Sequence, residues 1–268
     1  MEEGGKTALG TTARHGGERE DPLAGAIMPP VDLTSTYVQQ GLGENKGYEY
    51  ARGKNPTREA LERTIAALEG AEHGFAFASG MGCLDSIMKL FKSGNHIVCG
   101  SNVYGGPFRL FDKLLQHSGL SFTSGDTTDA QHIEDACTPR RKAILVETPT
   151  NPLMQITDLV AAADVAHAHQ ALLIVDNTFA TPYFQQPFSY GAAIVFHSAT
   201  KYLNGHSDVI CGVATVIDAD LAARLQFIHN EAGSVAGPVH SLRCLRRRIA
   251  PQPPSTRPLT TPHPPRAD

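Results

Sequence analysis

The sequence lacks any apolar run that approaches the roughly 18 consecutive residues of a membrane-spanning helix. Residues 1–20 are polar and rich in glycine, without the apolar stretch of a signal peptide. The net charge of −4 gives no sign of the basic face that binds nucleic acid. We therefore expect a cytoplasmic protein with neither membrane nor nucleic-acid partners.

Paired cysteines and nucleotide-binding or hydrolase motifs are also missing. The five cysteines are widely spaced and none forms a C-x-x-C pair, which disfavours a disulfide framework or a zinc site. His167 and His169 stand two residues apart on an expected helix and point in different directions, so we expect no metal. Neither a G-x-x-x-x-G-K-[ST] loop nor a G-x-S-x-G elbow occurs.

What the sequence does contain is an alternation of helical and strand patterns from residue 55 onward. Asn55 and Pro56 suit the start of a helix that Gly70 would end. Short apolar runs follow, and helical segments separate them. Such alternation predicts an α/β fold with a mostly parallel sheet flanked by helices. The apolar runs are GFAFAS (74–79), HIVC (96–99), AILVE (143–147), ALLIV (171–175) and AAIVF (192–196).

The carboxyl ends of parallel strands carry the ligand-binding loops, so the residues after each run are candidates for chemistry. Lys201, in HSATKYLNGHSD (197–208), could form a Schiff base with a carbonyl cofactor. Asp176, directly after ALLIV, could pair with a protonated pyridine nitrogen and make the ring an electron sink. Taken singly, a solvated lysine and a capping or turn aspartate are the simpler interpretations.

Other residues could bind a phosphate and a flat ring. Ser79, Gly80 and Met81 lie between a strand and a helix, where free N–H groups can form a cradle for an anion, although an ordinary tight turn is the simpler interpretation of this segment alone. The hydroxyls of Ser198 and Thr200 could complete that cradle.

Three more candidates lie in loops. Tyr104 could stack on a ring, or be a packed loop aromatic. Tyr50 and Arg52 precede the first helix, and arginine suits phosphate, although a solvated loop charge is the alternative. Together, the lysine, the acid, the cradle and the aromatic are the parts of a pyridoxal 5′-phosphate (PLP) site.

From about residue 10 to residue 237 the chain resembles the Cys/Met-metabolism enzymes that use PLP, the family of cystathionine γ-synthase, γ-lyase and β-lyase. The resemblance implies the aspartate-aminotransferase-like (type I) fold. The motifs that carry it are GAIMPPVDLTSTY, YEYARGKNPT, FASGMG, NVYGG, ETPTNP, VDNTFATPYFQQP and HSATKYLNGHSD.

The resemblance assigns roles to matching positions. Lys201 would carry the cofactor and move protons at Cα and Cβ, Asp176 would hold the pyridine nitrogen, and Tyr104 would stack on the ring. Asn151 would lie near the ring hydroxyl. The phosphate would be bound by Ser79, Gly80, Met81, Ser198 and Thr200.

An oligomer is also implied. Tyr50 and Arg52 would reach the neighbouring subunit's phosphate site, so that a dimer completes each site and two dimers form a homotetramer. Residues 1–55 would be the arm that does so, and residues 56–237 the PLP-binding domain.

The implied activity is γ-replacement or γ-elimination on the amino acids O-acylhomoserine or cystathionine. NVYGGPFRLFDK resembles the γ-synthase and γ-lyase branch, and Gly106 stands where methionine γ-lyases have a cysteine. Cystathionine β-lyase and homoserine sulfhydrylase remain alternatives.

The chain departs from the family pattern in two places. Ala193 occupies a position that is usually acidic or glutamine. Residues 238–268, with eight prolines, six arginines and one acidic residue, stand in place of the family's C-terminal domain, and we expect them to be disordered.

Because the composition changes abruptly to this proline- and arginine-rich tail, we hypothesise a frameshift or truncation near Gly237 and Pro238. The resemblance also implies an arginine in the C-terminal domain that fixes the substrate's α-carboxylate, and no position of this chain matches it. The alternatives to a working enzyme are a non-catalytic PLP-binding remnant or a subunit that only associates with intact homologues, and a plain α/β scaffold with a partner-binding tail.

Overall fold

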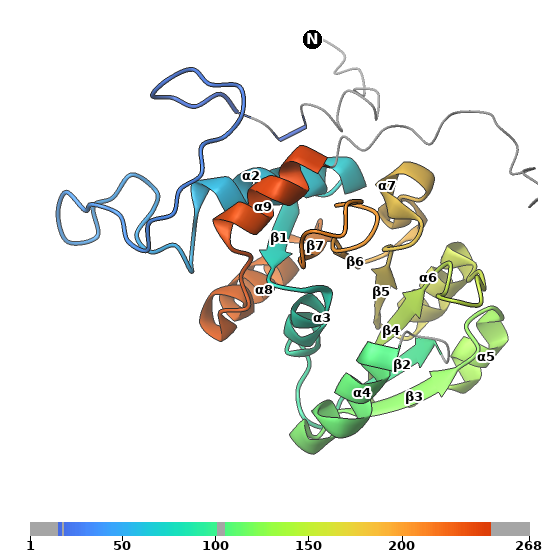
Figure 1. The fold of residues 1–268 in the computed structure, drawn as a ribbon. Helices are drawn as coiled ribbons and strands as arrows, with labels where there is room; N and C mark the ends of the chain where they lie inside the picture. Colours follow the sequence, from blue (N-terminus) through green and yellow to red (C-terminus); the bar gives the residue numbers. More distant parts are fainter. Residues whose placement is uncertain (1–15, 18, 101–104, 248–268) are drawn as a thin grey trace, which may run out of the picture.

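A seven-stranded sheet forms the centre of the computed structural model, which describes residues 16, 17, 19–100 and 105–247 (Figure 1). The strand order is β1-β7-β6-β5-β4-β2-β3. β7 runs antiparallel to both of its neighbours, and the other strands are parallel to one another, which confirms the expected mostly parallel sheet. The strands are β1 (His73–Phe77), β2 (His96–Gly100), β3 (Ser121–Gly125), β4 (Arg141–Glu147), β5 (Leu172–Asp176), β6 (Ile194–Ser198) and β7 (Gly212–Val216).

Helices cover both faces of the sheet. The core on one face packs the sheet against α3 (Gly80–Met88), α4 (Gly105–Lys113) and α8 (Ala219–Ala232). The opposite face carries α2 (Pro56–Glu69) and α9 (Pro238–Arg247) over β1 and β7, and α5 (Ala130–Asp135) and α6 (Leu159–Ala168) over β4 and β5. The described residues also include three short helices, η1 (Leu115–Ser118), α7 (Thr181–Phe184) and η2 (Pro187–Tyr190).

Local chemistry explains where the long helices begin and end. The Asn55 side chain caps α2 by accepting from the backbone N–H of Arg58 at 3.1 Å, and Gly70 ends that helix in a left-handed conformation. Asp218 caps α8 in the same way by accepting from the N–H of Leu221. The expected boundaries of α2 are therefore confirmed.

The expectation of disorder is wrong for residues 238–247, which form helix α9 on top of α2 (Figure 1). Ser241, Cys244 and Leu245 are buried on the contacting face. The high proline and arginine content of the whole tail concealed this one amphipathic helix, whose first residue is Pro238, where proline is tolerated. Residues 248–268 lie outside the described residues.

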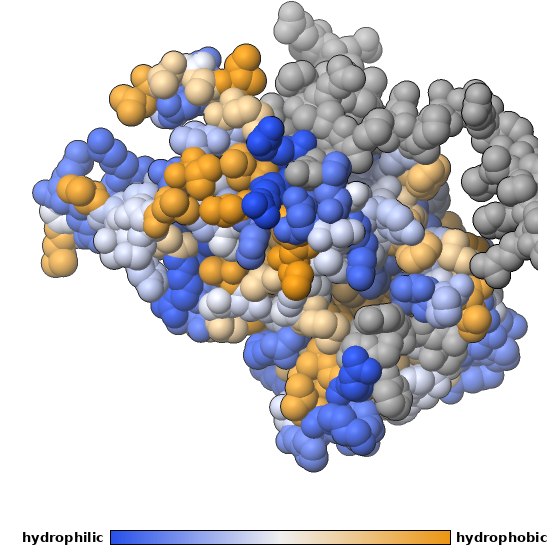
Figure 2. All heavy atoms as spheres, in the orientation of Figure 1, coloured by the Kyte–Doolittle hydropathy of each residue, from blue (hydrophilic) through white to orange (hydrophobic). Residues whose placement is uncertain are grey.

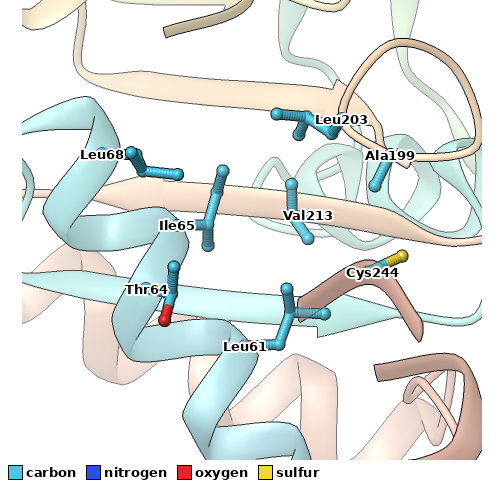
Figure 3. A pocket seen from close by; sticks show the side chains of 8 residues that line it. All are labelled: Leu61, Thr64, Ile65, Leu68, Ala199, Leu203, Val213 and Cys244. Carbon is cyan, nitrogen blue, oxygen red and sulfur yellow. The ribbon is translucent and has the colours of Figure 1, made fainter. Parts of the chain in front are cut away.

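α9 helps to line a small apolar pocket beside α2 and β7 (Figure 3). Most of its lining is hydrocarbon, and the Thr64 hydroxyl is already engaged by the carbonyl of Ala60 at 2.8 Å, so the pocket is poorly suited to orient a polar substrate. Its residues are Leu61, Thr64, Ile65, Leu68, Ala199, Leu203, Val213 and Cys244.

The segment 19–55 leaves the body as extended loops (Figure 1). It is tied to the start of α2, where Asn55 Nδ2 donates to the carbonyl of Asp32 at 2.9 Å and the N–H of Asp32 donates to Thr57 Oγ1 at 2.9 Å. Apolar side chains on the loops are exposed, and Figure 2 shows hydrophobic residues there. No helix in the described part of the chain is long and apolar enough to cross a membrane.

Candidate functional site

The carboxyl ends of β5 and β6 lie side by side and are joined by a side-chain hydroxyl. Asp176 ends β5, and its register partner on β6 is Phe196. Asp176 Oδ1 accepts hydrogen bonds from the backbone N–H and the hydroxyl of Thr178, and Thr178 Oγ1 accepts from the N–H of Ser198 at 2.8 Å. The acid predicted to hold the pyridine nitrogen is therefore linked, through the side chain of Thr178, to the segment that contains Lys201.

The N-terminus of α3 packs directly against Ser198, the last residue of β6. Ser79 caps the helix by accepting from the N–H of Gly82 at 3.0 Å. A Cβ atom placed on Gly80 would lie 2.9 Å from Ser198 Cβ and 3.0 Å from Ser198 Oγ. Only glycine therefore allows this approach, which sets the first turn of the helix beside the serine hydroxyl.

This arrangement fits a phosphate. The first N–H groups of a helix have no intrahelical acceptor, and they attract anions. Among the described residues no hydrogen bond is recorded for the N–H groups of Gly80 and Met81. The Ser198 hydroxyl next to them adds a further donor. Ser79, Gly80 and Ser198 are thus brought together as the cradle model requires, while their binding to phosphate stays a prediction.

Lys201 lies in a tight loop directly after β6. Its N–H donates to the carbonyl of Ser198 at 3.1 Å, and its own carbonyl accepts from the N–H of Gly205 at 2.7 Å. The side chain is exposed. The loop therefore attaches the lysine rigidly by its backbone to the serine of the cradle, and leaves its amine accessible.

Thr200 has a structural partner. Its hydroxyl accepts from the N–H of Cys211 at 3.1 Å and lies 3.2 Å from the carbonyl of the same residue, to which it can donate. These contacts hold the loop to the start of β7. A hydroxyl has one proton to donate, so a phosphate contact as donor would compete with Cys211.

The Asp176 carboxylate has an oxygen to spare. Its recorded hydrogen bonds within the described residues all end on Oδ1, which leaves Oδ2 for another donor. Burial raises the pKa of this carboxyl, whereas the Thr178 hydrogen bonds and the His197 imidazole lower it. Burial prevails, so the pKa is raised on balance, and a protonated pyridine nitrogen at Oδ2 would oppose this effect and favour the ionised form. The turn interpretation of Asp176 is also correct, because Oδ1 forms that turn with Thr178.

The remaining predicted residues are not joined to this cluster by any recorded contact in the described chain. Asn151 lies in the loop after β4, between two proline peptide bonds in the cis form. The Arg52 guanidinium carbon lies 5.6 Å from the centre of the Tyr50 ring, and both side chains are exposed. Tyr104 lies outside the described residues.

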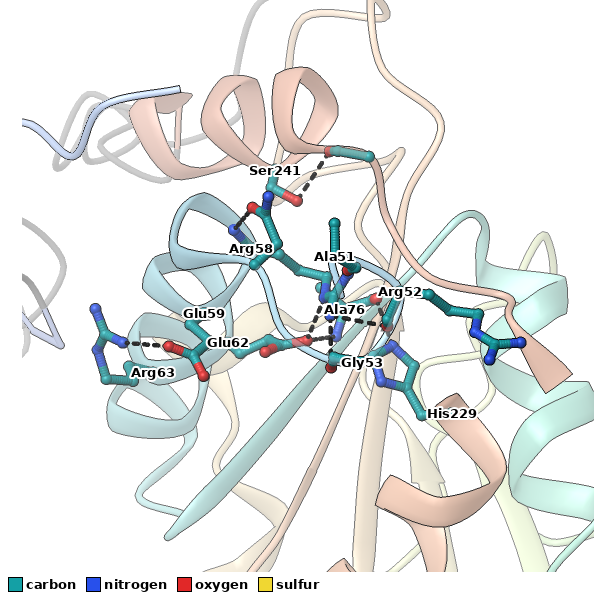
Figure 4. Close-up of polar contacts among 12 residues, drawn as sticks. Ala51, Arg52, Gly53, Arg58, Glu59, Glu62, Arg63, Ala76, His229 and Ser241 are labelled. Carbon is teal, nitrogen blue, oxygen red and sulfur yellow. Dashed lines mark hydrogen bonds and ion pairs between the residues drawn. The ribbon is translucent and has the colours of Figure 1, made fainter. Parts of the chain in front are cut away.

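A buried arginine fixes the position of Tyr50 and Arg52. The Arg58 guanidinium donates to the backbone carbonyls of Ala51, Arg52 and Gly53 at 2.8, 3.1 and 2.9 Å (Figure 4). The loop that presents Tyr50 and Arg52 is thus anchored to α2, although their side chains point into solvent.

Sequence reasoning missed Thr178, His197 and Glu69. Thr178 stands two residues after the acid, and its signal was the hydroxyl in DNTF. His197 is fully buried and donates from Nε2 to Glu69 Oε1 at 2.6 Å. A polar residue inside an apolar strand and another at the end of an apolar helix face were the available signals.

No group of three metal-ligand side chains occurs in the described ranges, and His169 pairs with Glu134.

Comparisons with known proteins show which family the chain resembles over most of its length. The family model described as "Cys/Met metabolism PLP-dependent enzyme" matches residues 10–247. Over 235 residues the chain is 48% identical to cystathionine beta-lyase of Lactococcus lactis subsp. cremoris (strain MG1363). Over 232 residues it is 49% identical to cystathionine gamma-lyase of Bacillus subtilis (strain 168).

The alignments cover most of this chain and less of the relatives. They span 88% of the chain and 62% of the Lactococcus protein, and 87% and 61% for the Bacillus protein. The crystal structure of cystathionine gamma-lyase from Lactobacillus plantarum complexed with L-serine matches with a TM-score of 0.89 at 46% identity, over 91% of this chain and 64% of that chain. The chain thus spans about three fifths of the length of these relatives.

Proposed function

Because the chain belongs to the Cys/Met-metabolism family of PLP-dependent enzymes, we propose that it catalyses trans-sulfuration chemistry on sulfur amino acids. The substrates would be cystathionine or an O-acylhomoserine, with bond breaking or replacement at Cγ. One observation carries this proposal: hydrogen bonds and one glycine contact place Asp176, the Lys201 loop and the start of α3 at a single sheet edge.

Each group would do a separate task. PLP, when bound, supplies an electron sink in conjugation with the substrate's α-carbon. The α3 N-terminus and the Ser198 hydroxyl would bind its phosphate, and Asp176 Oδ2 would accept from the pyridine nitrogen. The Lys201 amine would hold the cofactor's aldehyde carbon in the resting enzyme. When it is free, the same amine would accept the proton from the substrate's Cα and return a proton at Cγ or Cβ.

The exposed apolar arm supports a proposed oligomer. Leu33, Val38 and Leu42 are 72%, 87% and 105% exposed, and covering such side chains with a second copy would remove apolar surface from water. A second copy of the chain that covered this arm would receive Tyr50 and Arg52 near its own cradle. A small-molecule amino acid and a dimer or tetramer of this chain are therefore the proposed partners.

β-Elimination is the second candidate. Its support is the 48% identity to a cystathionine beta-lyase, which equals the likeness to the gamma-lyase within one percent. Products distinguish the reactions: γ-elimination of cystathionine yields cysteine, 2-oxobutyrate and ammonia, whereas β-elimination yields homocysteine, pyruvate and ammonia. Formation of cystathionine from an O-acylhomoserine and cysteine would identify γ-replacement.

The test has two stages. Purified protein with PLP should be yellow, and borohydride reduction should fix the cofactor to the peptide that contains Lys201, whereas Lys201→Ala should not be labelled. The three product assays then follow. A colourless, unlabelled protein would refute PLP binding. A labelled protein without any turnover would refute the enzyme and favour the non-catalytic remnant.

A further inference from the structure

A buried carboxylate links helix α2 to the ends of β5 and β6. Glu69, the last residue of α2, is 1% exposed. Its Oε1 accepts from His197 Nε2 at 2.6 Å and from Asn177 Nδ2 at 2.9 Å. Both partners are fully buried, one on β6 and the other immediately after β5. One side chain therefore spans the two strand ends that carry Ser198 and Asp176.

The same set of hydrogen bonds extends to β4. Asn177 Nδ2 also donates to the carbonyl of Gln185 at 2.9 Å. Gln185 Nε2 donates to Asn177 Oδ1 at 2.9 Å and to the carbonyl of Thr148, directly after β4, at 3.1 Å. Glu69, Asn177, Gln185, His197 and the Thr148 carbonyl form what we call the Glu69 network. Three neighbouring strand ends are thus tied to one helix.

The network lies on the face of the sheet opposite the candidate site. Side chains alternate along a strand, so His197 points toward α2 while Ser198 points toward α3. Asp176 and Asn177 are consecutive in the same way. His197 on β6 and Asn177 directly after β5 are therefore each the immediate neighbour of a candidate site residue, and a shift of one must move the other.

Stability alone explains the network poorly. Within the described residues, Glu69 Oε2 and His197 Nδ1 are buried without a hydrogen-bond partner. Apolar side chains of similar volume commonly replace such buried pairs without loss of stability. A half-satisfied buried polar group in a native protein calls for another explanation, and a fixed geometry is the one that its position offers.

We propose that Glu69 is a positioning residue of the PLP site, which rests on the proposed function. By holding Asn177 and His197 together, it sets the separation between the Asp176 carboxylate and the Lys201 loop. Those two groups would hold opposite parts of one rigid ring system, so their spacing decides how well the cofactor fits. Glu69 itself touches neither cofactor nor substrate.

The test combines two measurements on Glu69→Ala and Glu69→Gln. Without cofactor, amide hydrogen exchange should quicken at Thr178 and Ser198, while β2 stays protected. With PLP, Glu69→Ala should bind the cofactor about tenfold more weakly, the size of effect that a residue coupled to a site without touching the ligand can have. Glu69→Gln retains an acceptor oxygen and should recover part of that affinity.

Two controls separate positioning from general weakening. Glu72→Gln changes an exposed carboxylate three residues away and should alter neither measurement. Ile65→Ala removes apolar packing from the same helix and is compared at equal global stability. The proposal is overturned if Ile65→Ala weakens PLP binding as much as Glu69→Ala, or if Glu69→Ala leaves both the affinity and the two amides within twofold of the parent chain. If the parent chain itself binds no PLP, the proposed function fails, and the exchange data alone decide the positioning role.

Discussion

At the scale of single residues, Gly80 decides whether the cradle can form. A methyl group there would lie within 3.0 Å of Ser198, and the glycine's φ is one that any residue adopts, so the conflict is purely steric. Gly80→Ala should destabilise the fold by about 1–3 kcal/mol and weaken PLP binding more than tenfold. Gly125→Ala is the matched control, because open space surrounds that Cβ position. Equal PLP affinity of the two variants, measured by absorbance titration, would contradict the cradle.

His229 should make the fold sensitive to acid. It is buried, it donates from Nε2 to the carbonyl of Ala76 at 2.8 Å, and burial lowers its pKa from 6.5 to about 4 (Figure 4). The unfolded chain binds a proton between pH 6.5 and pH 4 and the folded chain does not, so stability falls as pH falls through this range. The full loss is about 3 kcal/mol. In urea titrations from pH 7 to pH 4, the stability difference between the parent chain and His229→Gln should shrink by that amount. A constant difference would show that His229 titrates normally.

Glu62 acts on the same strand with the opposite sign. Its Oε1 accepts from the N–H of Ala76 at 3.0 Å and pairs with Arg58, and burial raises the pKa of the carboxyl from 4.5 to about 7. Here the folded chain binds the extra proton, so this contribution to stability is complete below pH 4.5 and is lost as pH rises to about 7. Glu62→Gln should therefore raise the slope of stability with pH between 4.5 and 7. A slope unchanged from the parent chain would refute the raised pKa.

At the scale of elements, the sequence predicted those whose pattern is local and strong. The apolar runs predicted β1, β2, β4, β5 and β6. The capping residue Asn55 and the terminating Gly70 predicted α2. Two strands were missed. β3 reads SFTSG, an edge strand with polar residues, and β7 reads GVATV, which is short, rich in small residues and antiparallel. Both owe their strand conformation to neighbours that the sequence does not put beside them.

In the candidate site, too, only the residues with a local sequence pattern could be predicted. Asp176, Lys201 and the α3 N-terminus could be predicted because they follow strands. Glu69 could not, because its hydrogen bond to His197 joins residues 128 positions apart. Long-range partners of a buried polar side chain leave no local pattern, so only the fold identifies them.

Helix α9 should be a stable part of the domain, contrary to its composition. Leu245 is fully buried against α2, so Leu245→Ala should lower the free energy of unfolding by about 2–5 kcal/mol. Val239, which is 45% exposed on the same helix, is the control, and Val239→Ala should cost less than about 0.5 kcal/mol. Urea unfolding measures both. If the two variants are equally stable, α9 is not part of the cooperative fold.

At the scale of the whole molecule, the arm of residues 19–55 relates assembly to the site. Leu33, Val38 and Leu42 are exposed, yet Arg58 fixes the end of the arm, so these side chains are presented in a defined place. Val38→Asp with Leu42→Asp should shift the protein toward monomers in sedimentation velocity, because burying two carboxylates in an apolar interface is costly. Leu114→Asp, at a leucine that is 62% exposed elsewhere, should leave the assembly unchanged. If Tyr50 and Arg52 serve a neighbouring cradle, the monomeric double variant should also bind PLP more weakly, and its affinity should no longer depend on protein concentration. Monomers that keep the parent affinity would mean that each chain builds its cradle alone, with Ser79, Gly80 and Ser198 sufficient for the phosphate.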